Sequence, residues 1–161
     1  MTENIQNKIT RYLVYKYTFD GDLVTNLKIQ KVLYFIYAWF LLNKNKRCFT
    51  EKFQAWPIGP VLPSIYQTLK KYGSSPISPD FSKITKGEDV EKLKKELGNS
   101  LLETIDEVYK VYGIKSAFEL VGLTHNELSW SRARKGLDAT AKTDKELSDD
   151  DIYEQHKKRK K

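Results

Sequence analysis

The sequence is poor in the residue types that form disulfides and metal sites. It contains one cysteine, Cys48, and two histidines, His125 and His156, among 161 residues. A single cysteine excludes a disulfide within the chain. Together with an N-terminus that lacks the apolar segment of a signal peptide, it indicates a reducing, cytoplasmic location. These three side chains are not at the spacing of zinc ligands, so we expect no bound metal.

The chain also lacks a hydrophobic run long enough to cross a membrane. Apolar and aromatic residues are continuous from Val32 to Leu42, and the run ends at the polar stretch 43–47. A transmembrane helix needs about 20 apolar residues. A shorter helix that is apolar on all sides must be buried in protein. The sequence therefore predicts that residues 25–42 form the central helix of a domain, with Thr25 as its N-cap.

No combination of residues indicates catalysis or cofactor binding. Residues 125–127 mimic the His-x-Glu of zinc deaminases, but the Pro-Cys-x-x-Cys pair of those enzymes is absent. Arg47 could lower the pKa of Cys48, yet nothing in the sequence supplies a base. Residues 113–116 lack the order of a phosphate-binding loop. Carboxylates at 149–151 begin a predicted helix, where the helix dipole accounts for them. We expect no catalytic residue and no cofactor.

The positive charge of the chain is concentrated at its C-terminus. The net charge is +7, and the last five residues, 157–161, are all lysine or arginine, which leaves +2 for residues 1–156. A block of like charges at a terminus is usually solvated and disordered. Two interpretations stay open for this segment: a solvated tail, or a tail that contacts the phosphates of a nucleic acid.

Apolar periodicity and helix-capping patterns predict a single, mainly α-helical domain. Capping boxes are expected where Ser or Thr precedes Glu by three residues, at 100–103, 116–119 and 124–127. The expected helices are 3–17, 25–42, 63–72, 89–97, 100–112, one beginning near 117, and a short one beginning at 148. We expect the helical domain to occupy residues 1–138. Residues 139–161 are expected to form a linker, the short C-terminal helix and a basic tail.

Residues 49–58 interrupt the helical pattern. Phe53 and Ala55 alternate with polar or amphipathic neighbours, as in a short strand. Prolines at 57, 60 and 63 exclude a helix through the segment that follows. We predict a small β element near residues 49–58, with a short strand around Ile77 as its candidate partner. Gly59 is expected either to lie close to the central helix or to adopt a conformation that disfavours a β-carbon.

Two tryptophans lie outside the apolar helical stripes, at Trp56 and Trp130. Each could anchor its own loop on the domain or contact a partner. Arg132 and Arg134 follow Trp130, and tryptophan and arginine are the residues most often found at the energetic centres of protein interfaces. We therefore predict a partner-contact site formed by Trp56, Trp130, Arg132 and Arg134.

Three blocks of sequence resemble the Panacea domain, a phage-associated family. The first block is residues 25–34, the second is 55–66, and the third is Leu-Thr-His at 123–125 with a tryptophan six residues after the threonine. The resemblance covers about residues 5–135. It departs from the family at Ser129, where proline is expected before the tryptophan. The residues that carry it are Lys28, Gln30, Lys31, Tyr34, Trp56, Gly59, Pro60, Tyr66 and His125.

The resemblance implies a mostly helical fold and an antitoxin role in a bacterial or prophage toxin–antitoxin pair. Panacea domains neutralise toxins by direct protein contact and are not known for catalysis, which agrees with the lack of a catalytic set above. The implied partner is a cognate protein toxin, with no membrane contact. The alternative is a nucleic-acid-binding phage or prophage regulator that uses the basic C-terminal tail.

Overall fold

The computed structural model describes residues 2–160. Eight α-helices and one two-stranded sheet are found in this part of the chain. The helices are α1 (Ile5–Phe19), α2 (Asn26–Lys44), α3 (Pro63–Leu69), α4 (Gly87–Leu97), α5 (Asn99–Val108), α6 (Ala117–His125), α7 (Leu128–Ala133) and α8 (Asp149–Arg159). The strands are β1 (Gln54–Trp56) and β2 (Gly59–Val61). The mainly helical fold and the small β element are confirmed.

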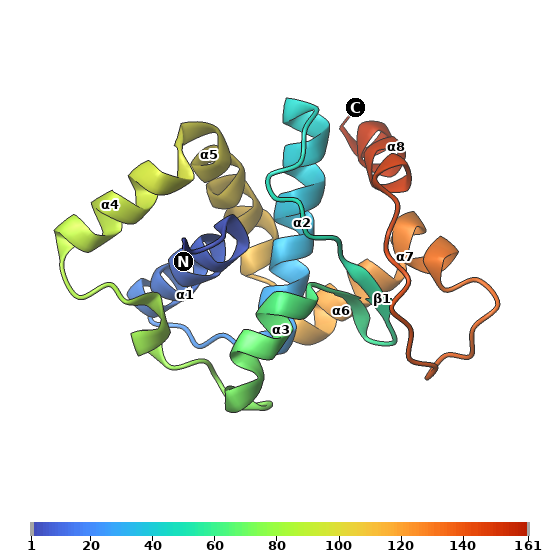
Figure 1. The fold of residues 1–161 in the computed structure, drawn as a ribbon, viewed down its shortest axis with the longest axis horizontal. Coiled ribbons are helices and arrows are strands. Elements are labelled where there is room, and N and C mark those ends of the chain that lie inside the picture. Colours follow the sequence, from blue (N-terminus) through green and yellow to red (C-terminus); the bar gives the residue numbers. More distant parts are fainter. Residues whose placement is uncertain (1, 161) are drawn as a thin grey trace.

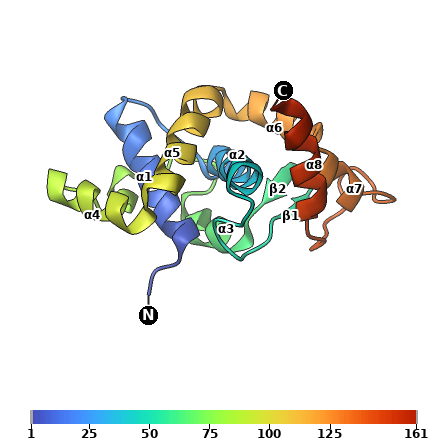
Figure 2. The ribbon, with the colours of Figure 1, turned by 90° about the horizontal axis from the view of Figure 1, so that it is seen from above.

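Helix α2 is the centre of the molecule, as predicted. Figure 1 shows α1, α4 and α5 on one side of it and the sheet, α7 and α8 on the other; Figure 2 shows α2 end-on with the other elements around it. The Thr25 side chain accepts a hydrogen bond from the Lys28 amide at 3.3 Å, which confirms the N-cap. Every residue from Ile29 to Ala38 is buried. No helix within residues 2–160 is both long and apolar enough to cross a bilayer.

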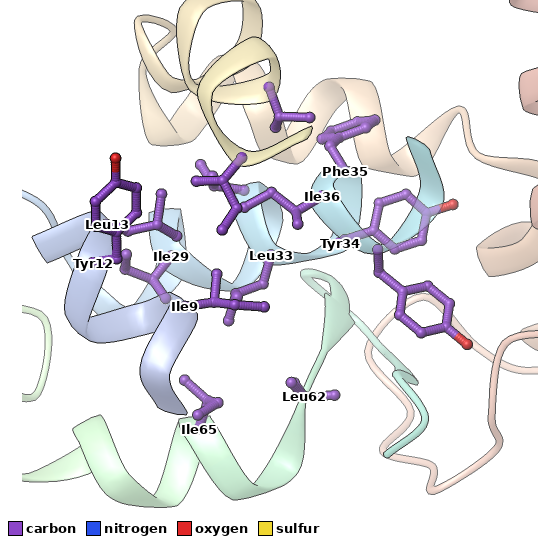
Figure 3. Close-up of a cluster of buried hydrophobic side chains, with 14 of the residues drawn as sticks. Ile9, Tyr12, Leu13, Ile29, Leu33, Tyr34, Phe35, Ile36, Leu62 and Ile65 are labelled. Carbon is purple, nitrogen blue, oxygen red and sulfur yellow. The ribbon is translucent and has the colours of Figure 1, made fainter. Parts of the chain in front are cut away.

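Apolar side chains fill the space between α2 and its neighbours α1, α3 and α5. Figure 3 shows Ile9 and Leu13 of α1 beside Ile29 and Leu33 of α2, with Ile65 of α3 close by. This side of the core is built mainly from aliphatic groups spaced at helical intervals, with the rings of Tyr12 and Tyr17 of α1 in the same cluster, and the sequence pattern predicts it well.

Strands β1 and β2 form a hairpin that differs from the predicted β element in its partner. They pair antiparallel with Trp56 opposite Gly59, and Pro57 and Ile58 form the turn between them. The predicted pairing with a strand at Ile77 is wrong, because that residue donates its amide to the Val24 carbonyl instead. The proline-rich segment therefore provides the second strand itself.

The other edge of β1 is covered by the segment that follows α7. The Ala55 amide donates to the Lys145 carbonyl, and the Leu147 amide donates to the Phe53 carbonyl, both at 2.9 Å. Because these bonds lie on the two sides of Gln54, residues 145–147 run along β1 as an irregular third strand. The chain thus returns to the hairpin about 90 residues later in the sequence.

The predicted capping boxes have different outcomes. Ser116 and Glu119 cap α6 as expected, each side chain accepting the other residue's amide at 3.1 Å. The box at Ser100 is wrong, because α5 already begins at Asn99 and Gly98 precedes it without a side-chain cap. The box at 124–127 is also wrong: Thr124 lies inside α6, and the Glu127 carboxylate binds elsewhere.

The basic C-terminal segment is partly helical and partly packed on the domain. Helix α8 continues through Arg159, whose guanidinium lies 2.6 Å from the buried Glu127 carboxylate. The Lys160 ammonium donates to the Asn43 side chain at 2.8 Å. The expectation that this whole segment is a solvated tail is therefore wrong for Arg159. Lys161 lies outside the described residues.

Candidate functional site

Several of the residues that carry the family resemblance converge on the β-hairpin. From α2, the Gln30 side-chain oxygen accepts the Leu62 amide at 2.8 Å. The next residue, Lys31, donates from its ammonium to the Pro60 carbonyl at 3.1 Å. Two consecutive side chains of the central helix therefore hold the backbone of β2 and the residue that follows it.

The third sequence block holds the turn of the hairpin. The Trp130 indole N–H donates to the Trp56 carbonyl at 2.8 Å, and a ring nitrogen of His125 lies 3.2 Å from the Pro57 carbonyl. The two rings stack on each other, with centroids 4.4 Å apart and planes 14° from parallel. This geometry shows Trp130 anchoring the hairpin, one of the two roles that the sequence left open.

Arg134 extends this set of contacts and is itself buried, with 7% of its surface exposed. Its guanidinium donates to the Ala55 carbonyl at 2.7 Å and to the carbonyls of Asp138 and Ala141 at 2.8 and 2.9 Å. Arg134 therefore ties β1 to the loop after α7. Since its donors are used internally, replacing it would disturb the fold and could not isolate a binding effect.

Lys31 and Gly59 form the tightest contact beneath the hairpin. Lys31 is fully buried, and burial lowers the pKa of its ammonium to about 7. Gly59 has a φ of +110°, and a β-carbon there would lie 2.6 Å from the Thr124 hydroxyl and 3.1 Å from the Lys31 side chain. Both alternatives predicted for Gly59 are confirmed, because the position combines a close approach with a conformation unsuited to a β-carbon.

A buried polar cluster lies where α2, α7 and α8 meet. The Tyr34 hydroxyl donates to Glu127 at 2.7 Å and lies 3.0 Å from the Ser129 hydroxyl, so the residue that departs from the family joins this cluster. Arg159 supplies the cation, as a charge contact rather than an aligned hydrogen bond. Burial and the nearby Glu127 raise the pKa of Tyr34. Burial lowers the pKa of His156, whose ring is 3.9 Å from Glu127.

Sequence reasoning missed Glu127, Ser129 and Arg159 as a cluster. Glu127 and Tyr34 are 93 residues apart, and Arg159 belongs to a segment whose composition is typical of a solvated tail. No local pattern marks such residues, because each finds its partner only after the chain has folded.

The outer face of the hairpin borders an open groove of about 680 Å³. Its walls are the hairpin, α3 with the residue after it, and the loop 140–144. The Trp56 and Tyr66 rings meet edge to face with centroids 4.8 Å apart, and the Trp56 indole donates to the Gln54 side chain. At the turn, Ile58 is 46% exposed. A rigid backbone thus carries apolar side chains that reach solvent.

The remaining predicted residues lie at the margins of this surface or elsewhere. Arg132 is exposed and pairs with Asp151 at 2.5 Å, which joins α7 to α8. The Lys28 ammonium lies over the Tyr17 ring of α1, 4.9 Å from its centroid. The structure thus brings Trp56 and Trp130 together but buries Arg134. The partner-contact role of the predicted residues stays a prediction.

The one cysteine of the chain lies outside the hairpin, in surroundings that disfavour its thiolate. Burial raises the pKa of the Cys48 thiol to about 12, so the thiolate that a nucleophile requires is scarce at neutral pH. Across residues 2–160, no three His, Cys, Asp or Glu side chains are grouped as a metal ion would need. What the arrangement provides is a hairpin held at several backbone atoms, with an exposed outer face.

Comparisons with known proteins identify the family of the chain. The family described as "Antitoxin SocA-like, Panacea domain" matches residues 29–131, well over half of the chain. The curated protein "Antitoxin SocA" of Caulobacter vibrioides (strain NA1000 / CB15N) is 29% identical over 106 residues, which are 63% of this chain and 55% of that protein. The match thus spans about half the length of that relative. No solved structure matches. The matched range contains the hairpin and most of the side chains that hold it, and the chain belongs to the SocA-like antitoxin family with a Panacea domain.

Proposed function

We propose that this protein is the antitoxin of a bacterial or prophage toxin–antitoxin pair and that it neutralises its cognate toxin by direct contact in the cytosol. The observation that carries the proposal is the position of the family's motif residues. Lys31, His125 and Trp130 each bind a backbone carbonyl of one hairpin, and none of them lies in a set arranged for catalysis. Their arrangement supports a role in shaping a surface.

The proposed mechanism is occlusion of the toxin by a preorganised surface. Ordering a loop on binding costs free energy, about 0.5–1.5 kcal/mol for each side chain that is immobilised. A hairpin already fixed at the carbonyls of residues 55, 56, 57 and 60 avoids much of this cost. We propose that the contact surface is centred on Trp56 and Ile58 and continues towards Trp130 and Arg132.

Co-expression tests this function. The protein would be produced together with the product of the neighbouring reading frame, scored by growth and by co-purification of the two chains. We expect the neighbouring product alone to arrest growth, and the pair to grow and to co-purify as a stable complex. Growth rescue without any complex, or no toxicity from the neighbouring product, would contradict neutralisation by direct contact.

A further inference from the structure

The groove beside the hairpin has the dimensions and lining of a binding site. Its volume of about 680 Å³ falls within the range of about 300–1,000 Å³ that is typical of ligand sites. Trp56, Ile58 and Tyr66 supply apolar lining, and Lys70 after α3 and Lys142 of the loop 140–144 also line the groove. Apolar side chains beside two lysines suit a ligand that carries an apolar group next to a charged group.

Two walls of the groove, the hairpin and the loop 140–144, are fixed by hydrogen bonds to the rest of the domain. The hairpin wall is fixed by Lys31 and Trp130, as described above. The loop wall is fixed at one end by Arg134, which binds the Ala141 carbonyl, and at the other end by the pairing of residue 145 with β1. The groove is therefore present before any ligand binds.

The charges of the groove indicate an acidic ligand. Lys70 and Lys142 are both exposed, and neither ammonium lies within 4 Å of a carboxylate among residues 2–160. Asp144 is the one acidic residue in the lining described, so cations outnumber anions. A carboxylate on the ligand would give these lysines the partner that the protein itself does not provide.

The described ends of the chain bind elsewhere and do not fill the groove. Near the N-terminus, Glu3 pairs with Arg11 on α1 at 2.7 Å. Near the C-terminus, Lys160 binds Asn43 at the far end of α2, and Figure 1 shows this end of the chain away from the hairpin turn. Neither of these two described ends therefore occupies the groove.

We propose that this groove binds an extended segment of the toxin in which a large apolar side chain neighbours a carboxylate. The apolar side chain packs against Trp56, Ile58 and Tyr66, and the carboxylate faces Lys70 and Lys142. The proposal rests on the antitoxin function proposed above and assigns the part of the toxin that is recognised. Extended segments are recognised in this way elsewhere, with pockets for side chains providing specificity.

Charge reversal on matched surfaces tests the proposal with the purified toxin as probe. The Lys70→Glu/Lys142→Glu variant should bind the toxin at least tenfold more weakly than wild type. The control, Lys92→Glu/Lys95→Glu, makes the same change in net charge at exposed residues of α4 and should change Kd less than twofold. Both variants should keep the wild-type melting temperature. Equal binding by wild type and the groove variant would overturn the proposal.

A second experiment separates this proposal from the antitoxin function. A phage-displayed library of random 12-residue peptides would be selected on the wild-type protein. We expect enriched peptides that pair an aromatic or large aliphatic residue with Asp or Glu, and that lose binding to the groove variant but not to the α4 control. This result would stand even if the neighbouring gene product proved not to be the toxin. A selection that yields no such peptides would overturn the groove as a peptide site.

The exposed Phe118 on α6 is a second apolar surface to which the toxin could bind, and it is compared with Ile58 of the hairpin turn. Phe118 at the start of α6 is 88% exposed, outside the groove. Phe118→Ser should leave toxin binding within twofold of wild type, whereas Ile58→Ser should weaken it at least fivefold. If the Phe118 variant loses binding and the Ile58 variant keeps it, the toxin binds α6 and the proposal is wrong.

Discussion

The two sides of the central helix are held by different kinds of interaction. Towards α1 and α5, α2 packs through aliphatic side chains such as Ile29 and Leu33, with Ile105 of α5 in the same core. Towards the hairpin and α8, it presents Lys31 and Tyr34, which bind a backbone carbonyl and a buried carboxylate. Apolar packing is non-directional, whereas hydrogen bonds fix orientation.

This difference suggests how stability and recognition are divided within the domain. Burying a polar group costs free energy unless its hydrogen bonds are satisfied. Burying the Lys31 ammonium and the Glu127 carboxylate therefore costs more free energy than burying apolar groups. In return, these two side chains define the positions of the hairpin and of α8. We infer that the apolar side supplies most of the stability and that the polar side sets the shape of the contact surface.

The largest effect is expected at the closest approach between the hairpin and its support. Gly59→Ala places a methyl group against the Thr124 hydroxyl at a φ of +110°. Backbone strain and overpacking together should lower the free energy of unfolding by about 3–4 kcal/mol. Gly21→Ala is the matched control: its φ is +77° at the left-handed end of α1 but nothing lies within 4 Å, so about 1 kcal/mol is expected. Chemical denaturation measures both, and equal losses would contradict the close packing at Gly59.

The next effect concerns the cation of the buried cluster. Arg159→Ala leaves the Glu127 carboxylate buried without its counter-charge, and the arginine is partly exposed, so a loss of about 2 kcal/mol is expected. Lys158→Ala, an exposed neighbour in α8, should change stability by less than about 0.5 kcal/mol. If thermal denaturation finds the two variants alike, the contact between Arg159 and Glu127 does not stabilise the domain.

A buried lysine should make stability depend on pH. The folded pKa of Lys31 is about 7 and its ordinary value is 10.5, so the unfolded chain binds more protons between these values and stability rises with pH. From pH 7 to 8.5 the gain should be about 1.5–2 kcal/mol. This window lies below the ordinary pKa values of Cys48 and the buried tyrosines. Denaturation of Lys31→Met over the same range should lack this slope; an unchanged slope would assign it to another group.

The same contrast explains what could be predicted from the sequence. The central helix, its cap at Thr25 and the capping box at Ser116 depend on neighbouring residues, and the predictions were confirmed. Arg134 was predicted to contact a partner because it follows Trp130 and because arginine is frequent at the energetic centres of interfaces. Its burial depends on carbonyls at residues 55, 138 and 141, which only the folded chain brings together. Long-range polar contacts therefore account for the surprises at Arg134 and Arg159, whereas the capping boxes at 100–103 and 124–127 failed because the helices begin or end at other residues.

The smallest effect is expected on the apolar side. Ile105 is fully buried in α5, and Ile105→Val removes one methylene there. The loss should be about 1 kcal/mol, with no change in the pH dependence, because no titratable group is altered. Chemical denaturation at pH 7 and 8.5 checks both statements. A loss that differed between the two pH values would show that the two sides of α2 are coupled.

The central claim is that the toxin binds the side of the molecule that carries the hairpin. Hydrogen–deuterium exchange of the protein, alone and in complex with its toxin, tests this directly, because amides covered by a partner exchange more slowly. The account predicts new protection at residues 54–61 and 140–147 and none in α4. New protection confined to α1, α4 and α5, with the hairpin exchanging as in the free protein, would contradict it.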